Sequence, residues 1–268
     1  MAALYGEGLH PDVEQRVEDG ATVASCQLGR QYATYSKGVA VLEAIKKAEN
    51  EHKKATGKLL SIEDRNRIGL ETARPFYAEA TGNVDAGARE VLAWLNEEKN
   101  KVRQPVSGMD LTFSPAKSVS VVWALADDDT RKAIQDIHER SVSDALAYVE
   151  DNLLFTRTGA RGERQIKAAG MMAATFMHYD TREGDPDLHT HCLISNKVQA
   201  DESAGLSPAD AAKWRALDTR FLFKNSAKAG QIYTRMMNQR LSEELGFALR
   251  ERTATDGKSS TWEIAGVS

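Results

Sequence analysis

The chain has 268 residues, of which 41% are hydrophobic and 28% charged, and its formal net charge is −4. These proportions are ordinary for a globular protein with one large domain or two small ones. No run of about 18 uncharged apolar residues occurs, which excludes a membrane-spanning helix, and the first residues lack the regions of a secretory signal. Two cysteines, Cys26 and Cys192, make no disulfide framework, so we expect reduced thiols in a cytoplasmic protein.

The charge is unevenly distributed along the chain. Residues 213–240 contain seven Lys or Arg residues and a single acid, Asp218, whereas acids outnumber basic residues within 1–100. A basic segment on an acidic chain is typical of a surface that follows a phosphate backbone. A solvated helix face is the alternative explanation for such a charge run.

The first 107 residues are predicted to be mostly helical. Amphipathic patterns predict helices over residues 36–56, over the stretch 62–82 and over 85–98. Ser61 is expected to cap the second of these helices, with Asp64 completing a weak capping box. This part of the chain contains no cluster of chemically useful side chains.

The pattern changes at Gly108. Residues 109–113 alternate and predict a strand, after which Ser114 and Pro115 are suited to cap and open a helix. The apolar spacing over residues 129–153 predicts a long helix.

More strands are expected in the rest of the chain. The segments LFTRTG and RQIKAAG flank a Gly- and Arg-rich turn and predict a β-hairpin. Residues 171–181 and 188–198 predict two strands joined by the polar turn REGDPD. Residues 226–245 predict a helix that ends at Gly246, and TWEIAGVS predicts a short strand.

Half of the six histidines lie within fourteen positions: His178, His189 and His191. Side chains two apart on a strand share a face, so His189 and His191 point the same way. Antiparallel pairing across the polar turn would place His178 opposite them. Three imidazoles on one face make a metal half-shell with open coordination positions, and an all-nitrogen set suits Mn, Zn, Co or Ni better than Ca. Hydrogen-bonded histidines without a metal are the alternative.

Two blocks of the sequence resemble the signature of the helicase-linked TraI/TrwC-type conjugative relaxases, the MobF class of the HUH endonuclease superfamily. The blocks are DLTFSPAKSVS and FMHYDTREGDPDLHTHCLISNKV, and the similarity continues through FKNSAKAGQIYTRMMNQRLSEELGF to WEIAGV. The residue types keep the same order with tight internal spacing, so the match is specific and covers most of the chain.

The resemblance implies an α+β fold in which a central antiparallel sheet is flanked by helices, the palm-like fold of HUH relaxases. It makes residues 1–268 one relaxase domain, with 1–107 as the mostly helical part and 108–268 as the sheet-bearing catalytic core. The implied reaction is site- and strand-specific cleavage of single-stranded DNA at the nic site of a plasmid transfer origin. A tyrosine hydroxyl would attack a phosphodiester, giving a 5′-phosphotyrosine and a free 3′-hydroxyl. The implied partners are that DNA, a helicase region in the full-length protein, and relaxosome and coupling proteins.

The resemblance also assigns roles to individual residues. His178, His189 and His191 match the metal ligands, and the implied cofactor is a divalent metal (Mg²⁺, Mn²⁺ or Zn²⁺) that polarises phosphate oxygens. Asp110 matches an aspartate that would orient a ligating histidine or draw off the proton of the nucleophile. Without the resemblance, a turn-capping aspartate is the simpler interpretation of Asp110.

The nucleophilic tyrosine finds no matching position. Relaxases of this kind carry it near the extreme N-terminus, whereas MAALYGEGLHPD resembles the stretch downstream of that tyrosine segment. Tyr5, Tyr32 and Tyr35 are the N-terminal candidates. We expect that the tyrosine segment and the helicase both lie outside this sequence, and that the chain binds DNA and metal without forming the covalent adduct.

Five cations are candidates for contacts with DNA phosphates. They are Lys117, Arg182, Lys197, Arg220 and Lys224. Lys117 is expected near a helix N-terminus, a natural phosphate site, and Phe221 and Phe223 are candidates for base stacking. Each cation taken singly is equally well explained as a solvated surface residue.

Two other functions stay open at this point. One is a non-catalytic single-stranded DNA-binding module that keeps a metal as part of its fold. The other is a metal-dependent hydrolytic nuclease in which bound water attacks in place of a tyrosine.

Overall fold

The computed structural model describes residues 2–32, 36, 38–57, 60–102, 105–252 and 261–267. The chain divides into two compact units, Met1–Ser107 and Gly108–Ser268. Within the described ranges, no helix has the length and apolar character needed to cross a bilayer. The candidate Tyr35 lies outside the described residues.

The first unit is helical, as predicted. Its elements are η1 (Ala2–Glu7), α1 (Val13–Glu18), η2 (Val23–Cys26), α2 (Ala40–Thr56), α3 (Ile62–Thr81) and α4 (Ala88–Asn100). The predicted cap of α3 is confirmed, because the Ser61 side chain accepts a hydrogen bond from the Asp64 backbone N–H. The half-buried carboxylate of Glu7 pairs with Lys53 and Arg65, which ties η1 to α2 and α3.

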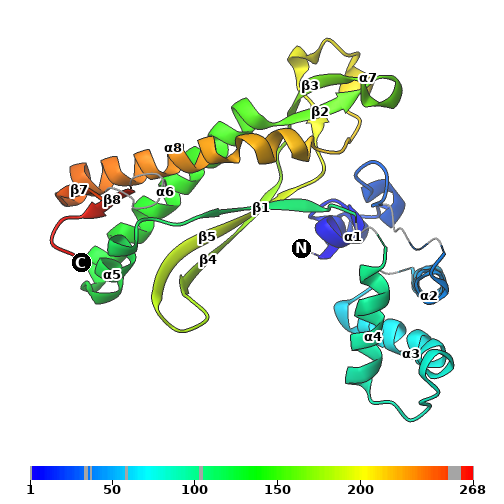
Figure 1. The fold of residues 1–268 in the computed structure, drawn as a ribbon. Helices are drawn as coiled ribbons and strands as arrows, with labels where there is room; N and C mark the ends of the chain where they lie inside the picture. Colours follow the sequence, from blue (N-terminus) through cyan, green and yellow to red (C-terminus); the bar gives the residue numbers. More distant parts are fainter. Residues whose placement is uncertain are drawn as a thin grey trace. The chain divides into compact units, whose positions relative to one another are not determined.

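The second unit contains all eight strands of the described chain (Figure 1). In chain order its elements are β1 (Gly108–Phe113), α5 (Lys117–Leu125), α6 (Asp128–Leu153), β2 (Phe155–Thr158), η3 (Ala160–Gly162), β3 (Arg164–Ala169), β4 (Ala173–Asp180), β5 (Pro186–Ser195), β6 (Gln199–Ala200), η4 (Glu202–Ala204), α7 (Pro208–Ala211), α8 (Thr219–Leu245), β7 (Leu249–Arg252) and β8 (Thr261–Ile264). The hairpin predicted around the Arg-rich turn is confirmed as β2 paired with β3.

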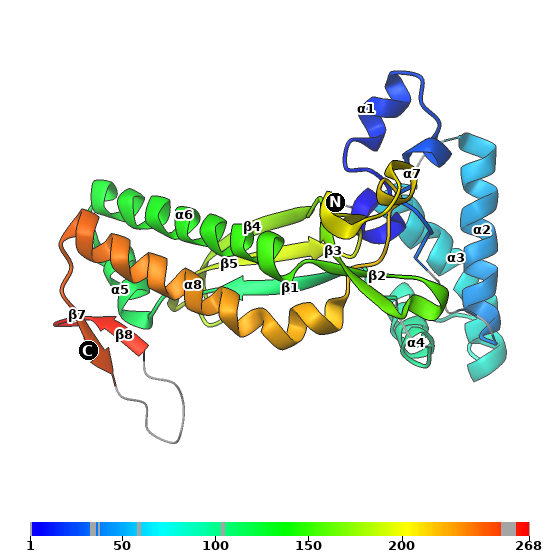
Figure 2. The ribbon, with the colours of Figure 1, turned by 90° about the horizontal axis from the view of Figure 1, so that it is seen from above.

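The main sheet has the strand order β1-β5-β4, and both pairings are antiparallel. Figures 1 and 2 show the long helices α6 and α8 side by side across one face of this sheet. The middle strand alternates in burial from residue 188 to residue 194: Leu188, Cys192 and Ile194 are fully buried and belong to the core that includes residues of α6 and α8. The opposite face of β5 is therefore the one left for chemistry. The predicted α+β class with a central antiparallel sheet is confirmed.

In the second unit, two predicted helix starts are wrong, for tertiary reasons. Helix α5 begins at Lys117 with Ala116 as its N-cap, not at the predicted Ser114 and Pro115. The carboxylate of Glu263 on β8 accepts hydrogen bonds from both the backbone N–H and the hydroxyl of Ser118, so a distant strand satisfies the first turn.

Helix α8 begins at Thr219, seven residues before the predicted start at residue 226. The Asp218 side chain caps it by accepting from the Phe221 backbone N–H. Leu222 is fully buried in this added segment, so core packing extends the helix beyond the stretch that its amphipathic pattern indicated.

Candidate metal centre

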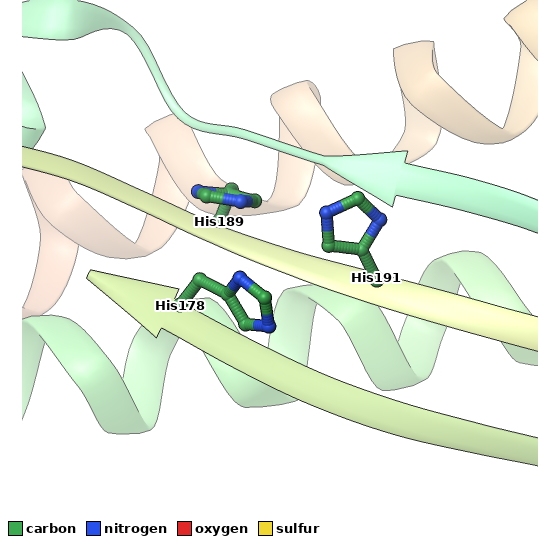
Figure 3. Close-up of side chains that lie close together, drawn as sticks. All are labelled: His178, His189 and His191. Atoms are coloured by element: carbon green, nitrogen blue, oxygen red, sulfur yellow. The ribbon is translucent and has the colours of Figure 1, made fainter. Parts of the chain in front are cut away.

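The β4–β5 hairpin brings the three predicted histidines together. His178 on β4 is the direct partner of His189 on β5, and His191 comes two residues later on the same face. The three ring centroids are 5.2 Å from one another in every pair. Figure 3 shows the rings converging on one side of the sheet, with the helices behind it. One nitrogen from each ring lies within 4.8 Å of the other two.

In His191 and His189, the ring nitrogen Nδ1 lies within hydrogen-bond distance of a protein oxygen. His191 Nδ1 lies 2.7 Å from Asp110 Oδ2 and 3.1 Å from the Thr112 hydroxyl, both on the neighbouring strand β1. His189 Nδ1 lies 2.7 Å from the Asp187 carbonyl oxygen. An acceptor at Nδ1 holds the proton there and leaves Nε2 with its lone pair, which is how metal-ligating histidines are usually oriented.

The residues present fit a divalent transition metal. Three neutral imidazoles are ligands that Zn, Cu, Ni or Mn accept, whereas Ca²⁺ prefers an oxygen shell. Three protein ligands also leave positions for a substrate oxygen, as catalytic sites require. His178 is exposed and His189 and His191 are partly exposed, so a phosphate can approach the centre from the open face.

A buried polar network lies on the opposite side of β5. His138 of α6 is fully buried, with Nδ1 2.8 Å from the Tyr233 hydroxyl and Nε2 2.7 Å from the Thr190 hydroxyl. Burial, with a smaller contribution from His189, lowers the pKa of His138 from 6.5 to about 4, so its ring is neutral at pH 7. Burial likewise raises the pKa of Tyr233 well above its usual range.

Sequence analysis missed this fourth histidine. The available signal was its position, because His138 falls beside Ile134, Ile137 and Ser141 on the buried stripe of α6. A polar ring on a buried helical stripe needs partners for both nitrogens. Neither partner can be located from the sequence, because Thr190 and Tyr233 are 52 and 95 residues away.

The predicted phosphate contacts have different environments. Arg182 in the β4–β5 turn is exposed, as are Arg220 and Lys224 in the first two turns of α8. Lys117 donates to the Pro186 carbonyl oxygen at 2.6 Å and thereby holds the start of β5. Lys197 is buried, which lowers its pKa, so the structure does not support a phosphate contact there.

The N-terminus of α5 does not offer the anion site expected for Lys117. Glu263 already places a carboxylate on the Ser118 N–H, and the Ser118 hydroxyl donates in turn to the same oxygen. The positive end of the helix dipole at the α5 N-terminus is therefore already paired with a carboxylate of the protein.

Aromatic side chains of the second unit differ in availability. Phe221 packs edge-on against Phe155, with ring centroids 4.6 Å apart, whereas Phe223 is 72% exposed. Phe176, which sequence analysis missed, is 42% exposed and lies two residues before His178, so it shares the histidine face.

A groove of about 1030 Å³ in the second unit includes one residue that contacts the metal centre. It lies between α8, the end of β1 and the β7–β8 hairpin, and it includes Thr112, the neighbour of His191. Most of the residues that line it are polar, among them Arg235, and the half-exposed ring of Trp262 also lines it.

The candidate tyrosines belong to the first unit. Tyr5 is half-buried in η1, and the Tyr32 hydroxyl donates to the Ser107 carbonyl oxygen at 3.1 Å.

Comparisons with known proteins agree with one another. The TrwC relaxase family matches residues 1–268. Two "Multifunctional conjugation protein TraI" sequences, from Escherichia coli and its strain K12, are 33% and 32% identical over 177 and 178 residues. Each alignment covers 66% of this chain, and the chain spans only 9% of either relative.

Solved structures of the conjugative relaxase TrwC with oriT DNA are also similar. One is 30% identical and covers 61% of this chain and 50% of that chain, with a TM-score of 0.49. A metal-bound structure is 26% identical and covers 70% and 63%, with a TM-score of 0.49. Because the family match extends over every residue, the chain belongs to the TrwC relaxase family.

Proposed function

We propose that this chain is the DNA-processing domain of a protein that cleaves and rejoins one DNA strand at a plasmid transfer origin, by transesterification to a tyrosine for which this sequence offers no matching position. The observation that carries the proposal is the convergence of His178, His189 and His191 on the open face of the sheet, within a chain of the TrwC relaxase family. The names of its relatives support the substrate, because TraI is called a conjugation protein and TrwC was solved with oriT DNA.

In this proposal the three histidines hold a divalent metal through one ring nitrogen each. When bound, the metal supplies Lewis-acid polarisation of the scissile phosphate oxygens. Asp110 accepts the Nδ1 proton of His191 at 2.7 Å, and the Asp187 carbonyl does the same for His189. Of the two roles considered for Asp110, orienting His191 is the one that this contact supports.

The DNA would be held by cations and aromatic rings on the same unit. Arg182, Arg220 and Lys224 are exposed and can reach phosphates, which makes affinity salt-dependent. Phe176 and Phe223 offer free ring surface for base stacking. The groove beside Thr112 supports a path for the strand next to the reacting phosphate, since its hydroxyl, amide and Arg235 side chains can donate to phosphates and bases.

The wider setting is that of conjugation. We propose a cytoplasmic protein whose partners are single-stranded DNA at the nic site, a helicase region of the full-length protein, and relaxosome and coupling proteins. The name of the TraI relatives, which calls them multifunctional conjugation proteins, supports the setting of conjugation.

One gel experiment tests the reaction class. The chain is incubated with Mn²⁺ and end-labelled oligonucleotides that carry a nic sequence or its scrambled version. A protein-linked band with the nic oligonucleotide alone supports the transesterase, whereas free fragments without such a band support a metal hydrolase. A nic-specific, metal-strengthened complex without cleavage supports a relaxase domain whose nucleophile is outside this sequence. Equal binding of both oligonucleotides supports a simple binding module.

The same gel identifies the nucleophile if a covalent band appears. Tyr5→Phe, Tyr32→Phe and Tyr35→Phe are compared one at a time. Loss of the band in one variant assigns the attacking hydroxyl, and its survival in all three excludes these tyrosines.

A further inference from the structure

Strand β5 is attached to α5 and α6 at three alternate residues. Lys117 donates to the Pro186 carbonyl at 2.6 Å, and the Ser120 hydroxyl accepts from the Leu188 N–H at 3.1 Å. The third attachment is the 2.7 Å contact between His138 Nε2 and the Thr190 hydroxyl. Residues 186, 188 and 190 point away from the face that carries residues 189 and 191. Of the three attachments, only the one at Thr190 is made by a side chain of β5, on the face opposite His189 and His191.

The third attachment is the one closest to the metal centre. Thr190 lies between His189 and His191 in the chain. Its side chain points to one face of the sheet, and the two imidazoles point to the other. A rotation of β5 about its own axis that moved the Thr190 hydroxyl would swing both imidazoles on the other face.

The network that holds Thr190 is closed and buried. His138, Thr190 and Tyr233 are at most 4% exposed, and both ring nitrogens of His138 have a partner. A neutral imidazole has one donor and one acceptor, and each hydroxyl can serve as either, so each of the four polar atoms has a partner. A buried hydrogen-bond network in a low-dielectric interior rigidifies its members, because a displacement that breaks one of its bonds leaves a buried polar atom unpaired.

We propose that His138 is a positioning residue for the metal centre, which acts through Thr190 to set the rotation of β5 and thereby the meeting point of the three imidazoles. The inference rests on the metal site of the proposed function. It goes beyond that function by assigning the geometry of the site to a side chain that touches no ligand, DNA or metal. An apolar residue would fill the same space without the cost of desolvating a ring and two hydroxyls, which favours a geometric role over simple core filling.

Thr190→Val and Thr190→Ser separate geometry from stability. Valine keeps the shape of threonine and removes the hydroxyl, whereas serine keeps the hydroxyl. Co²⁺ is titrated into each metal-free variant while its visible ligand-field spectrum is recorded, and Zn²⁺ competition gives the affinity. We expect Thr190→Val to weaken metal binding about tenfold and to change the spectrum, as loss of supporting hydrogen bonds does at metal sites. Thr190→Ser should keep the wild-type spectrum.

A matched control removes another buried hydroxyl on the same helix as His138. Ser141 is fully buried and donates to the Ile137 carbonyl oxygen, about one turn beyond His138. Ser141→Ala should lower the thermal stability and leave the Co²⁺ spectrum and affinity unchanged. His138→Gln adds a second measurement, because its amide can replace one hydrogen bond and should recover more metal affinity than His138→Leu.

The outcomes are distinguishable. Wild-type affinity and spectrum in Thr190→Val would overturn the positioning role, as would an equal loss of affinity in Ser141→Ala. Absence of metal binding by the wild-type chain would instead remove the metal site itself, together with the proposed function.

Discussion

The two faces of strand β5 have opposite chemistry. On the helix side, Leu188, Thr190 and Cys192 are buried, and burial raises the pKa of the Cys192 thiol to about 12. On the other side, His189 and His191 are open enough to bind an ion. The same ten-residue strand thus supplies core packing and a candidate metal centre. Burial alternates from one residue to the next along the strand, and this alternation separates structural side chains from reactive ones.

The largest effect is expected on metal affinity, when a histidine on the open face of β5 is replaced. His189→Ala removes a ligand and should weaken Zn²⁺ binding by more than the roughly 10–100-fold that loss of an outer-shell partner costs. Isothermal titration of the metal-free protein measures it, with His52→Ala in the first unit as the matched control. Unchanged affinity would mean that the histidines do not hold the metal.

His138, which is buried against the helix side of β5, should make the stability of the fold depend on pH. The pKa of His138 is about 4 in the folded protein against 6.5 for the ordinary group. Between these values the unfolded chain binds a proton that the folded chain excludes, so stability falls as pH drops from 6.5 to 4. The full difference corresponds to about 3 kcal/mol.

Urea unfolding of the metal-free protein at pH 7 and pH 5 checks this window. His138→Gln should lose less stability than the wild type on that change, because the variant has no group to protonate at this position. Equal losses would show that His138 is not held neutral by burial.

Asp110→Asn tests the hydrogen bond by which β1 orients His191 on the open face. The amide cannot accept the Nδ1 proton of His191 as strongly as the carboxylate, so we expect metal affinity to fall about 10-fold to 100-fold. Zn²⁺ competition measures the change, and Asp180→Asn at the exposed end of β4 is the control. An effect of Asp180→Asn of the same size would point to net charge rather than orientation.

Phe176→Ala tests DNA stacking on the histidine face. Loss of one stacked base should weaken binding of a nic-bearing oligonucleotide by about 1–3 kcal/mol. Fluorescence anisotropy measures it, and Phe176→Trp should retain affinity. If Phe223→Ala alone weakens binding, the strand passes along the start of α8 instead.

The smallest effect is expected for single cations. Arg220→Ala should reduce the slope of log K against log salt by about 0.7 for single-stranded DNA, with little change in sequence preference. Lys132→Ala, an exposed lysine of α6 paired with Asp136, is the charge-matched control and should leave the slope unchanged.

The sequence by itself determined the local features. Spacing placed His189 and His191 on one face, the hydrophobic pattern located most helices, and Ser61 capped α3 as predicted. These features depend on interactions within a few residues, or across one short turn in the case of His178.

Tertiary structure decided what depends on distant partners. The carboxylate of Glu263 binds the first turn of α5, which begins later than predicted. Lys197 is buried and not exposed. The hydrogen-bond partners of His138 lie 52 and 95 residues away in the sequence. No periodicity encodes such contacts, because they arise only when the folded chain places separate segments against each other and excludes water between them.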